Sequence, residues 1–139
     1  MKTKLENNLL FIRADIGEFI IDSIKKACKS YNVKCAQISG IGATDSFVCG
    51  VYNINNKAYK EIKFEGQFEI LSLSGNISQK DNETYVHAHI CASDENGRSF
   101  GGHLIDARVS VTSEIILIVS DSLIVRKFDE SLGINLMEF

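Results

Sequence analysis

The three histidines are the residues of this chain best suited to chemistry, because all of them lie in one short window. They occur as His87-Ala88-His89 and, after a polar stretch, as the last residue of Gly101-Gly102-His103. Imidazole is the commonest metal ligand in proteins and the side chain that normally titrates near neutral pH. This window is therefore a candidate binding site, and the rest of the chain is interpreted as the scaffold that positions it.

The spacing predicts that the three imidazoles meet on one face of a β-hairpin. The segment from Thr84 to Cys91 has strand character, and side chains two apart on a strand share a face, so His87 and His89 point the same way. Asn96-Gly97 is a strong turn signal. If the chain reverses about Asn96, His103 lies opposite His89 with Cβ atoms ~5 Å apart, and His87 lies within ~8 Å on the diagonal.

Such a cluster predicts a site for a divalent transition metal. Three nitrogen ligands with an open fourth position are typical of zinc that binds water or substrate, and nickel, iron and copper also accept imidazole. Zinc is our first choice. The alternative is that His87 and His89 are a half-buried polar pair. Cys91 could be a fourth ligand, but we interpret it as a small buried thiol. Gly101 and Gly102 either allow close approach to a ligand or only bend the strand, and a bulge there would shift the register.

The composition predicts one globular domain over residues 1–139. Apolar residues make up 45% of the chain and proline is absent, which excludes the disordered and collagen-like classes. No apolar run reaches the length of a membrane span, and the first residues lack the pattern of a signal peptide. The four cysteines are scattered without a Cys-x-x-Cys pair. We therefore expect reduced thiols in a cytoplasmic protein with no membrane partner.

The charge argues against direct DNA binding without excluding it. The formal net charge is −3, whereas proteins that bind nucleic acid through phosphates usually have a basic balance or a basic patch. The densest basic group, Lys25, Lys26 and Lys29, falls late in the predicted helix. Cations there complement the helix dipole and need no nucleic acid.

One helix is predicted, and it follows a first strand at residues 9–13. Asp15-Ile16-Gly17-Glu18 opens the helix, because Asp15 with Glu18 three positions later resembles a capping box. Asn32 is expected to end it. The residues that recur at helical spacing and form its apolar face are Ile20, Ile24, Ala27, Cys28 and Tyr31.

The remainder of the chain is predicted to form strands, which together with one helix gives an α+β fold with a mostly antiparallel sheet. The expected strands are 33–39, 46–52, 59–64, 68–74, the histidine hairpin, 113–120 and 123–128. Turns are expected at Gly40-Ile41-Gly42, at Glu65-Gly66 and at Asp121. The apolar run 115–119 predicts a strand buried on both faces, and the segment 132–139 is apolar enough to pack on the body or on a neighbour.

Several motifs occur in order along nearly the whole chain. The segment Phe68-Glu69-Ile70-Leu71-Ser72-Leu73-Ser74-Gly75 is the most recognisable, followed by His87-Ala88-His89 with Gly97 and Gly101-Gly102-His103-Leu104. Further motifs are Arg13 with Gly17-Glu18, Ile38-Ser39-Gly40-Ile41-Gly42 and Thr112-Ser113-Glu114-Ile115. In these segments the chain resembles the PPC domain family (plants and prokaryotes conserved), and the histidine motif is similar to the family's prokaryotic form.

The resemblance implies a compact PPC-like domain built on an antiparallel sheet, assembled as a homotrimer. In plants the domain follows an AT-hook in nuclear DNA-binding proteins, and stand-alone prokaryotic members carry the label of predicted DNA-binding proteins by association. The plant domains lack the histidine set, and this chain has no AT-hook. A role for DNA, or for a DNA-binding partner, therefore rests on analogy.

Three charged residues in predicted strands are further site candidates. Arg13 either binds an anion near the site or forms an ion pair with Glu69 or Glu114. Glu69 and Glu114 are the catalytic candidates, as a general base or as a partner that orients a histidine. The alternative for Glu69 is a structural salt bridge, within the chain or across a subunit boundary.

These observations lead to three functional hypotheses. The first, which we adopt, is a stand-alone PPC-domain protein of the predicted DNA-binding and regulatory family, a homotrimer with a metal site at His87, His89 and His103. The second is a small metal-dependent enzyme of hydrolase or lyase type that acts on a small molecule at the histidines. The third is an interaction module in which the histidines only pack or sense pH.

Overall fold

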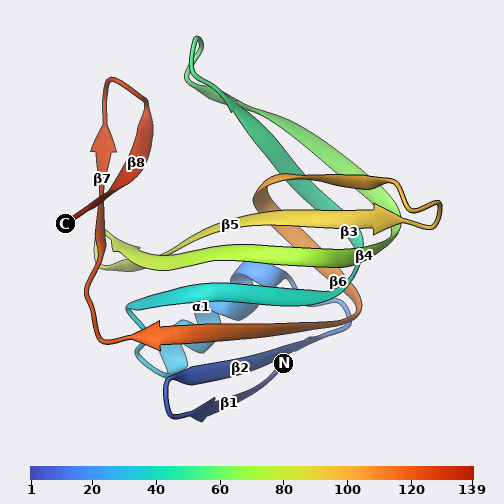
Figure 1. Ribbon diagram of the computed structural model, residues 1–139, viewed down its shortest axis with the longest axis horizontal. Helices are drawn as coiled ribbons and strands as arrows, with labels where there is room; N and C mark the ends of the chain where they lie inside the picture. The colour runs from blue at the N-terminus through green and yellow to red at the C-terminus, as the bar shows by residue number, and fades with distance from the viewer.

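The computed structural model describes residues 1–139 and consists of a single helix packed against a strongly bent, mostly antiparallel sheet (Figure 1). This confirms the predicted α+β class. The helix α1 is neither long nor apolar enough to cross a membrane. The elements in chain order are β1 (Lys2–Glu6), β2 (Leu9–Asp15), α1 (Ile20–Ser30), β3 (Cys35–Asn53), β4 (Ala58–Lys80), β5 (Glu83–Asp94), β6 (Ser99–Ser120), β7 (Val125–Asp129) and β8 (Ile134–Glu138).

The sheet is covered by the helix on one face and open on the other. Its strand order is β1-β2-β6-β3-β4-β7-β8, and β5 pairs with both β4 and β6. Figure 1 shows α1 behind the sheet, where its buried residues join those of β2, β3 and β6 in the hydrophobic core. Because side chains alternate between the faces of a strand, each of these strands also presents residues to the uncovered side.

The strand predicted to be buried on both faces is buried on one face only. Within β6, Ile115 and Leu117 are fully buried, whereas Ile116 and Ile118 are 38% and 43% exposed. Phe11 on the neighbouring strand β2 pairs with Ile116 and is also exposed. We call Phe11, Ile116 and Ile118 the open-face patch. The continuous apolar run therefore reflects a helix on one side and an uncovered apolar surface on the other.

Two strands run through positions where turns were predicted. β3 continues across Gly40-Ile41-Gly42, and β4 continues across Glu65-Gly66, with shifts in the β3–β4 register near both places. A β-bulge redirects a strand while keeping most of its pairing, so these glycines bend the strands and do not end them. A Cβ atom on Gly42 would lie 2.5 Å from the backbone oxygen of Thr112, so this crossing requires glycine.

The bends allow β4, β3, β6 and β5 to pair in a closed cycle at one end of the molecule. Four aromatic rings fill this end. Phe47 stacks on Phe64 with ring centroids 4.7 Å apart and meets Phe68 edge-on at 5.2 Å, and Phe64 contacts Phe100 at 4.9 Å. The aromatic cluster is thus the second part of the core and supports the strands that carry the histidines.

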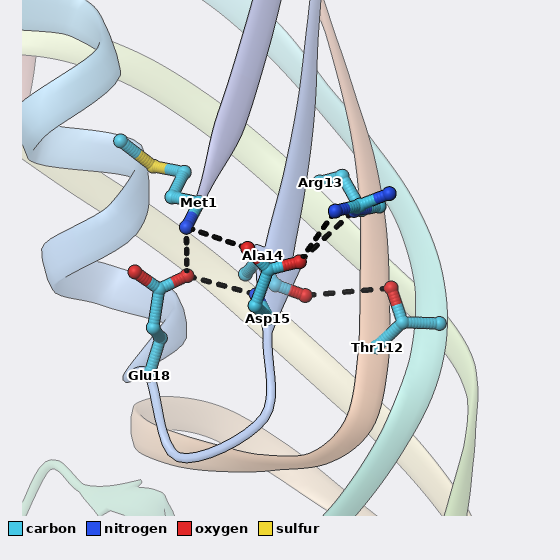
Figure 2. Close-up of polar contacts among 6 residues, drawn as sticks. All are labelled: Met1, Arg13, Ala14, Asp15, Glu18 and Thr112. Carbon is cyan, nitrogen blue, oxygen red and sulfur yellow. Dashed lines mark hydrogen bonds and ion pairs between the residues drawn. The ribbon is translucent and has the colours of Figure 1, made fainter.

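The helix begins later than its sequence motif indicated. Asp15 and Glu18 form a tight turn ahead of it, in which Glu18 Oε2 accepts the backbone N–H of Asp15 at 2.8 Å (Figure 2). The N-cap residue is Phe19, whose side chain makes no cap hydrogen bond. Instead Asp106 Oδ1 on β6 accepts the N–H of Ile21 at 3.2 Å. The capping function therefore comes from a distant strand, and the predicted helix end is right, because Asn32 has a positive φ of 52°.

Glu18→Gln is expected to lower the melting temperature at pH 7. It should also make the melting temperature fall less as the pH is lowered. Glu18 also lies 2.9 Å from the α-amino group of Met1, and the Asp15 N–H and this amine hold the pKa of Glu18 below its usual value (Figure 2). A lowered carboxyl pKa stabilises the fold above about pH 4.5, and the stabilisation is lost as the pH falls through the folded-state pKa. Thermal unfolding between pH 7 and pH 3 measures both effects, with Glu95→Gln on an exposed turn as the control. Identical pH profiles for Glu18→Gln and wild type would contradict this account.

After the predicted turn at Asp121 the chain does not return along β6. β7 does not pair with β6; it forms a single parallel bridge to β4, between Gln79 and Val125, and pairs antiparallel with β8. In Figure 1 the β7–β8 hairpin and the tip of the β3–β4 hairpin both rise away from the helix. They are joined by hydrogen bonds from Tyr52 to the Leu132 oxygen and from Lys57 to the Glu130 oxygen. The segment 132–139 thus packs on β7, and β7 is held against β4, the neighbour of the histidine strand β5.

Candidate metal centre

The three histidines meet on adjacent strands, in the register that the turn position predicted. His89 on β5 pairs with His103 on β6, and the pairing continues without a shift through Gly102 and Gly101. The ring centroids are 5.5 Å apart for His87–His89, 5.2 Å for His87–His103 and 5.5 Å for His89–His103. One ligand atom from each ring lies within 4.8 Å of the other two. The predicted convergence and register are confirmed.

The environment keeps two of the imidazoles, those of His87 and His103, neutral. His87 and His103 are half-buried and His89 is exposed. Burial, helped by the nearby Arg126 guanidinium and the other two rings, lowers the pKa of His87 to about 4. Burial also lowers the pKa of His103, with further contributions from His89 and Arg126. At neutral pH these two rings therefore offer lone pairs rather than positive charge.

The donor set fits a metal ion. His103 Nδ1 is buried and has no hydrogen-bond partner, although buried polar atoms are normally paired. A cation held by His87, His89 and His103 would supply the partner that no protein group provides. Imidazole nitrogens are ligands suited to zinc, nickel, iron and copper. Their role as ligands remains a prediction that the geometry favours.

Arg126 on β7 is a member of this site that the sequence analysis did not identify. Its Nη2 lies 3.2 Å from His87 Nδ1 and 2.9 Å from Asn76 Oδ1, and its Nε donates to Ser78 Oγ at 2.8 Å. Its guanidinium carbon stands 4.8 Å from the centroid of the Tyr85 ring. In the sequence Arg126 is one of two adjacent cations, with Lys127, at the end of an apolar run, and nothing in this pattern distinguishes the two.

Tyr59 is a second residue that the sequence did not predict for the site. Its ring lies 4.7 Å from the ring of His103, centroid to centroid, and contacts Tyr52 at 5.1 Å. Burial raises the pKa of the Tyr59 phenol, with smaller contributions from Tyr85 and Tyr52. Tyr59 reaches the histidines from the start of β4, so that the β3–β4 hairpin forms one wall of the centre.

Gly101 and Gly102 allow two strands to approach each other. A Cβ on Gly101 would lie 2.2 Å from the backbone oxygen of Ile90, and one on Gly102 would lie 2.8 Å from that of Gly50. Both contacts are with neighbouring strands, so the structure accounts for the glycines by strand packing. They let β6 lie close to β5 and β3, with His103 paired opposite His89.

The candidate carboxylates lie away from the histidines within one chain. Glu69 pairs with Ser93, which is four residues along β5 from His89 and hence ~13 Å from it. Glu114 on β6 lies opposite Arg13 on β2 and Ile41 on β3, eleven residues along β6 from His103. Arg13 forms its ion pair with Asp15 at 2.9 Å (Figure 2). Arg13 thus forms an ion pair, as one of its two interpretations predicted, but the partner is Asp15 and not Glu69 or Glu114.

Comparisons with known proteins give a family and close structural relatives. The sequence profile of the Plants and Prokaryotes Conserved (PCC) domain matches residues 1–121. A metal-containing protein from Archaeoglobus fulgidus is 33% identical with a TM-score of 0.88, over 100% of both chains. A plant- and prokaryote-conserved (PPC) protein from Pyrococcus horikoshii is 34% identical with a TM-score of 0.88, over 99% of this chain and 95% of that one.

A third solved structure is also similar over nearly the whole chain. This candidate DNA-binding protein from Bacteroides thetaiotaomicron is 28% identical with a TM-score of 0.96, over 99% of this chain and 96% of that one. No curated protein matches the sequence. The similarities extend over nearly the whole of each chain, so the fold described above is shared in full.

Proposed function

This chain belongs to the Plants and Prokaryotes Conserved (PCC) domain family, and we propose that it is a homotrimeric metalloprotein of this family with a DNA-associated, regulatory role. In this proposal His87, His89 and His103 bind one divalent transition metal, with zinc as the first candidate. The observation that carries the proposal is the convergence of three imidazoles on paired strands with one buried nitrogen left without a partner.

Two further observations support the metal. The relative from Archaeoglobus fulgidus, which is similar over its whole length, is a metal-containing protein. The lowered pKa values of His87 and His103 mean that protons compete weakly with a metal at neutral pH. His87 and His103 therefore have both the geometry and the protonation state that a metal ligand needs.

The open-face patch supports the homotrimer. Phe11, Ile116 and Ile118 lie on adjacent strands of a sheet face that α1 does not cover. An uncovered apolar surface on paired strands is typical of a contact with another chain. We propose that copies of this chain cover it in the trimer.

The DNA-associated role is supported by the relative from Bacteroides thetaiotaomicron, a candidate DNA-binding protein. The net charge of −3 opposes strong phosphate binding by the isolated chain. Association with DNA would therefore need either a surface assembled in the trimer, which binds directly, or a separate DNA-binding partner. If binding is direct, the affinity for duplex DNA falls steeply as salt rises.

The cysteines support a cytoplasmic location. All four are free, and burial raises the pKa of the Cys28 thiol to about 12. Reduced thiols of this kind are typical of the cytoplasm, where disulfides are rare.

One preparation tests the proposal. The chain is purified without a histidine tag, and its bound metal is measured beside its molar mass in solution. We expect about one transition-metal ion per chain and the mass of three chains. Metal-free protein that also fails to take up zinc would refute the metal site, a monomer would refute the trimer, and the absence of any DNA shift at low salt would refute direct DNA binding.

A second candidate function, a small metal-dependent enzyme of hydrolase or lyase type, is favoured by the exposure of His89. The centre opens to solvent at this ring, which gives a small molecule access to it. Glu69 and Glu114 would have to come from a neighbouring copy, because within one chain they lie away from the histidines. Turnover of small esters or hydroxy acids by the metal-loaded protein, abolished by Glu69→Gln or Glu114→Gln, would favour the enzyme.

A further inference from the structure

Arg126 is a half-buried cation whose contacts are all uncharged. Besides Asn76 Oδ1, Ser78 Oγ and His87 Nδ1, it donates from Nη1 to the backbone oxygen of Asn135 at 2.8 Å. None of these partners is a carboxylate. Charged groups that leave water are normally paired with an opposite charge, so the surroundings of Arg126 lack the anion that such a group requires.

The contact between Arg126 and His87 has a consequence for metal binding. Arginine can only donate hydrogen bonds, so His87 Nδ1 is the acceptor and a neutral His87 ring carries its proton on Nε2. A metal bound at Nε2 would need that proton to move to Nδ1, where it would face the guanidinium N–H. A metal bound at Nδ1 would displace the guanidinium directly. His87 therefore cannot hold a metal and accept from Arg126 at the same time.

Metal binding at His87 would thus release an N–H group of Arg126 at the centre. Arg126 uses four of its five N–H groups in the contacts above, so two would then lack an acceptor. The charges also favour an anion. Three neutral imidazoles do not neutralise the charge of a divalent ion, and Arg126 adds a further positive charge beside it. Only an anion satisfies both the free N–H groups and the excess positive charge.

We propose that the metal-loaded centre binds a small oxyanion, a carboxylate or an inorganic phosphate, which Arg126 holds beside the metal. This inference rests on the proposed metal site and assigns its ligand class. A guanidinium suits the purpose because its fixed N–H groups match the oxygens of carboxylate and phosphate. The exposed His89 side of the cluster gives the anion access from solvent. Arg126 then has two states, hydrogen-bonded to His87 without metal and bound to the oxyanion with metal.

The test uses the full chain loaded with Co²⁺, whose visible spectrum reports its ligands. Acetate and phosphate are titrated in separate arms at constant ionic strength, with chloride as the reference anion. We expect a saturable spectral change with acetate, phosphate or both, and the arm that responds identifies the oxyanion. Arg126→Gln should weaken that binding at least tenfold while Co²⁺ remains bound, and Arg126→Lys, which keeps the charge but not the fork, should give an intermediate loss.

Arg98→Gln is the matched control, because the Arg98 side chain is 70% exposed on the turn of the histidine hairpin and ion-pairs with Asp94. It should bind the oxyanion like wild type. Failure of wild type to bind Co²⁺ would overturn the metal site itself. Wild type that binds Co²⁺ but shows no spectral response to either oxyanion would overturn this inference alone, as would an Arg126→Gln variant that responds like wild type. If Arg126→Gln does not fold, the wild-type titration and Arg126→Lys still decide.

Discussion

His103→Ala is expected to abolish stoichiometric metal binding while leaving the fold intact. His103 faces both other rings, with centroids 5.2 Å from His87 and 5.5 Å from His89, and two imidazoles alone form an incomplete set. The loss in affinity should exceed the ~10–100-fold that follows removal of a group merely hydrogen-bonded to a ligand. Metal content and competition with a chromophoric zinc chelator measure it. Circular dichroism checks that the sheet is retained.

Cys91→Ser supplies the matched control for this variant. Cys91 follows His89 by two positions on β5 and pairs with Gly101, so it shares the strand face but is not among the clustered ligand atoms. It should bind metal like wild type, and a large loss would add Cys91 to the ligand set. Equal metal content in folded His103→Ala and wild-type protein would contradict the metal site and mean that the histidines have only a structural role.

Gly75→Ala should have the largest effect on stability of any single added methyl group near the site. Gly75 pairs with Ile38 on β3 and with Ala88 on β5, and its added Cβ would lie 2.1 Å from the His87 backbone oxygen and 2.7 Å from Ala88 Cα. Backbone atoms of a central strand cannot yield to such a contact without breaking pairs. We expect a destabilisation of about 3 kcal/mol or more, measured by denaturant unfolding.

The same substitution should also impair metal binding, because the clash falls on the strand that carries His87 and His89. Ser74→Ala is the control: Ser74 is exposed, lies beside Gly75 and pairs with His89. Its effect on the free energy of unfolding should stay within about 0.5 kcal/mol. A Gly75→Ala protein as stable as Ser74→Ala would mean that β4 and β5 are farther apart than described.

The register of the histidine hairpin could be predicted because it depends on local sequence. His89 and His103 lie at equal distances from Asn96, and in an antiparallel hairpin the turn position fixes which residues pair. The turn is itself locally specified, since Asp94 Oδ1 accepts the N–H groups of Asn96 and Arg98. The buried face of α1 was predictable for the same reason, because its spacing follows from helix geometry alone.

The bends in β3 and β4 were not predictable. Glycines in a strand can either end it or bend it, and the local sequence does not distinguish these outcomes. Gly40-Ile41-Gly42 could end a strand or bend it, and the choice depends on whether partner strands continue on both sides. The helix start was missed in a related way: Asp106, eighty-five residues from Ile21, supplies the cap that the local Asp15–Glu18 motif does not.

The sequence by itself therefore determined the α+β class, the family resemblance and the three histidines facing one another across a hairpin. Only the tertiary structure brought Arg126 to His87 and Tyr59 to His103, and placed Glu69 and Glu114 away from both. The physical reason is the range of the interactions. Pairing across a short turn is set by residue spacing, whereas contacts between strands far apart in the chain depend on where bulges bend the sheet and on which of its faces the helix covers.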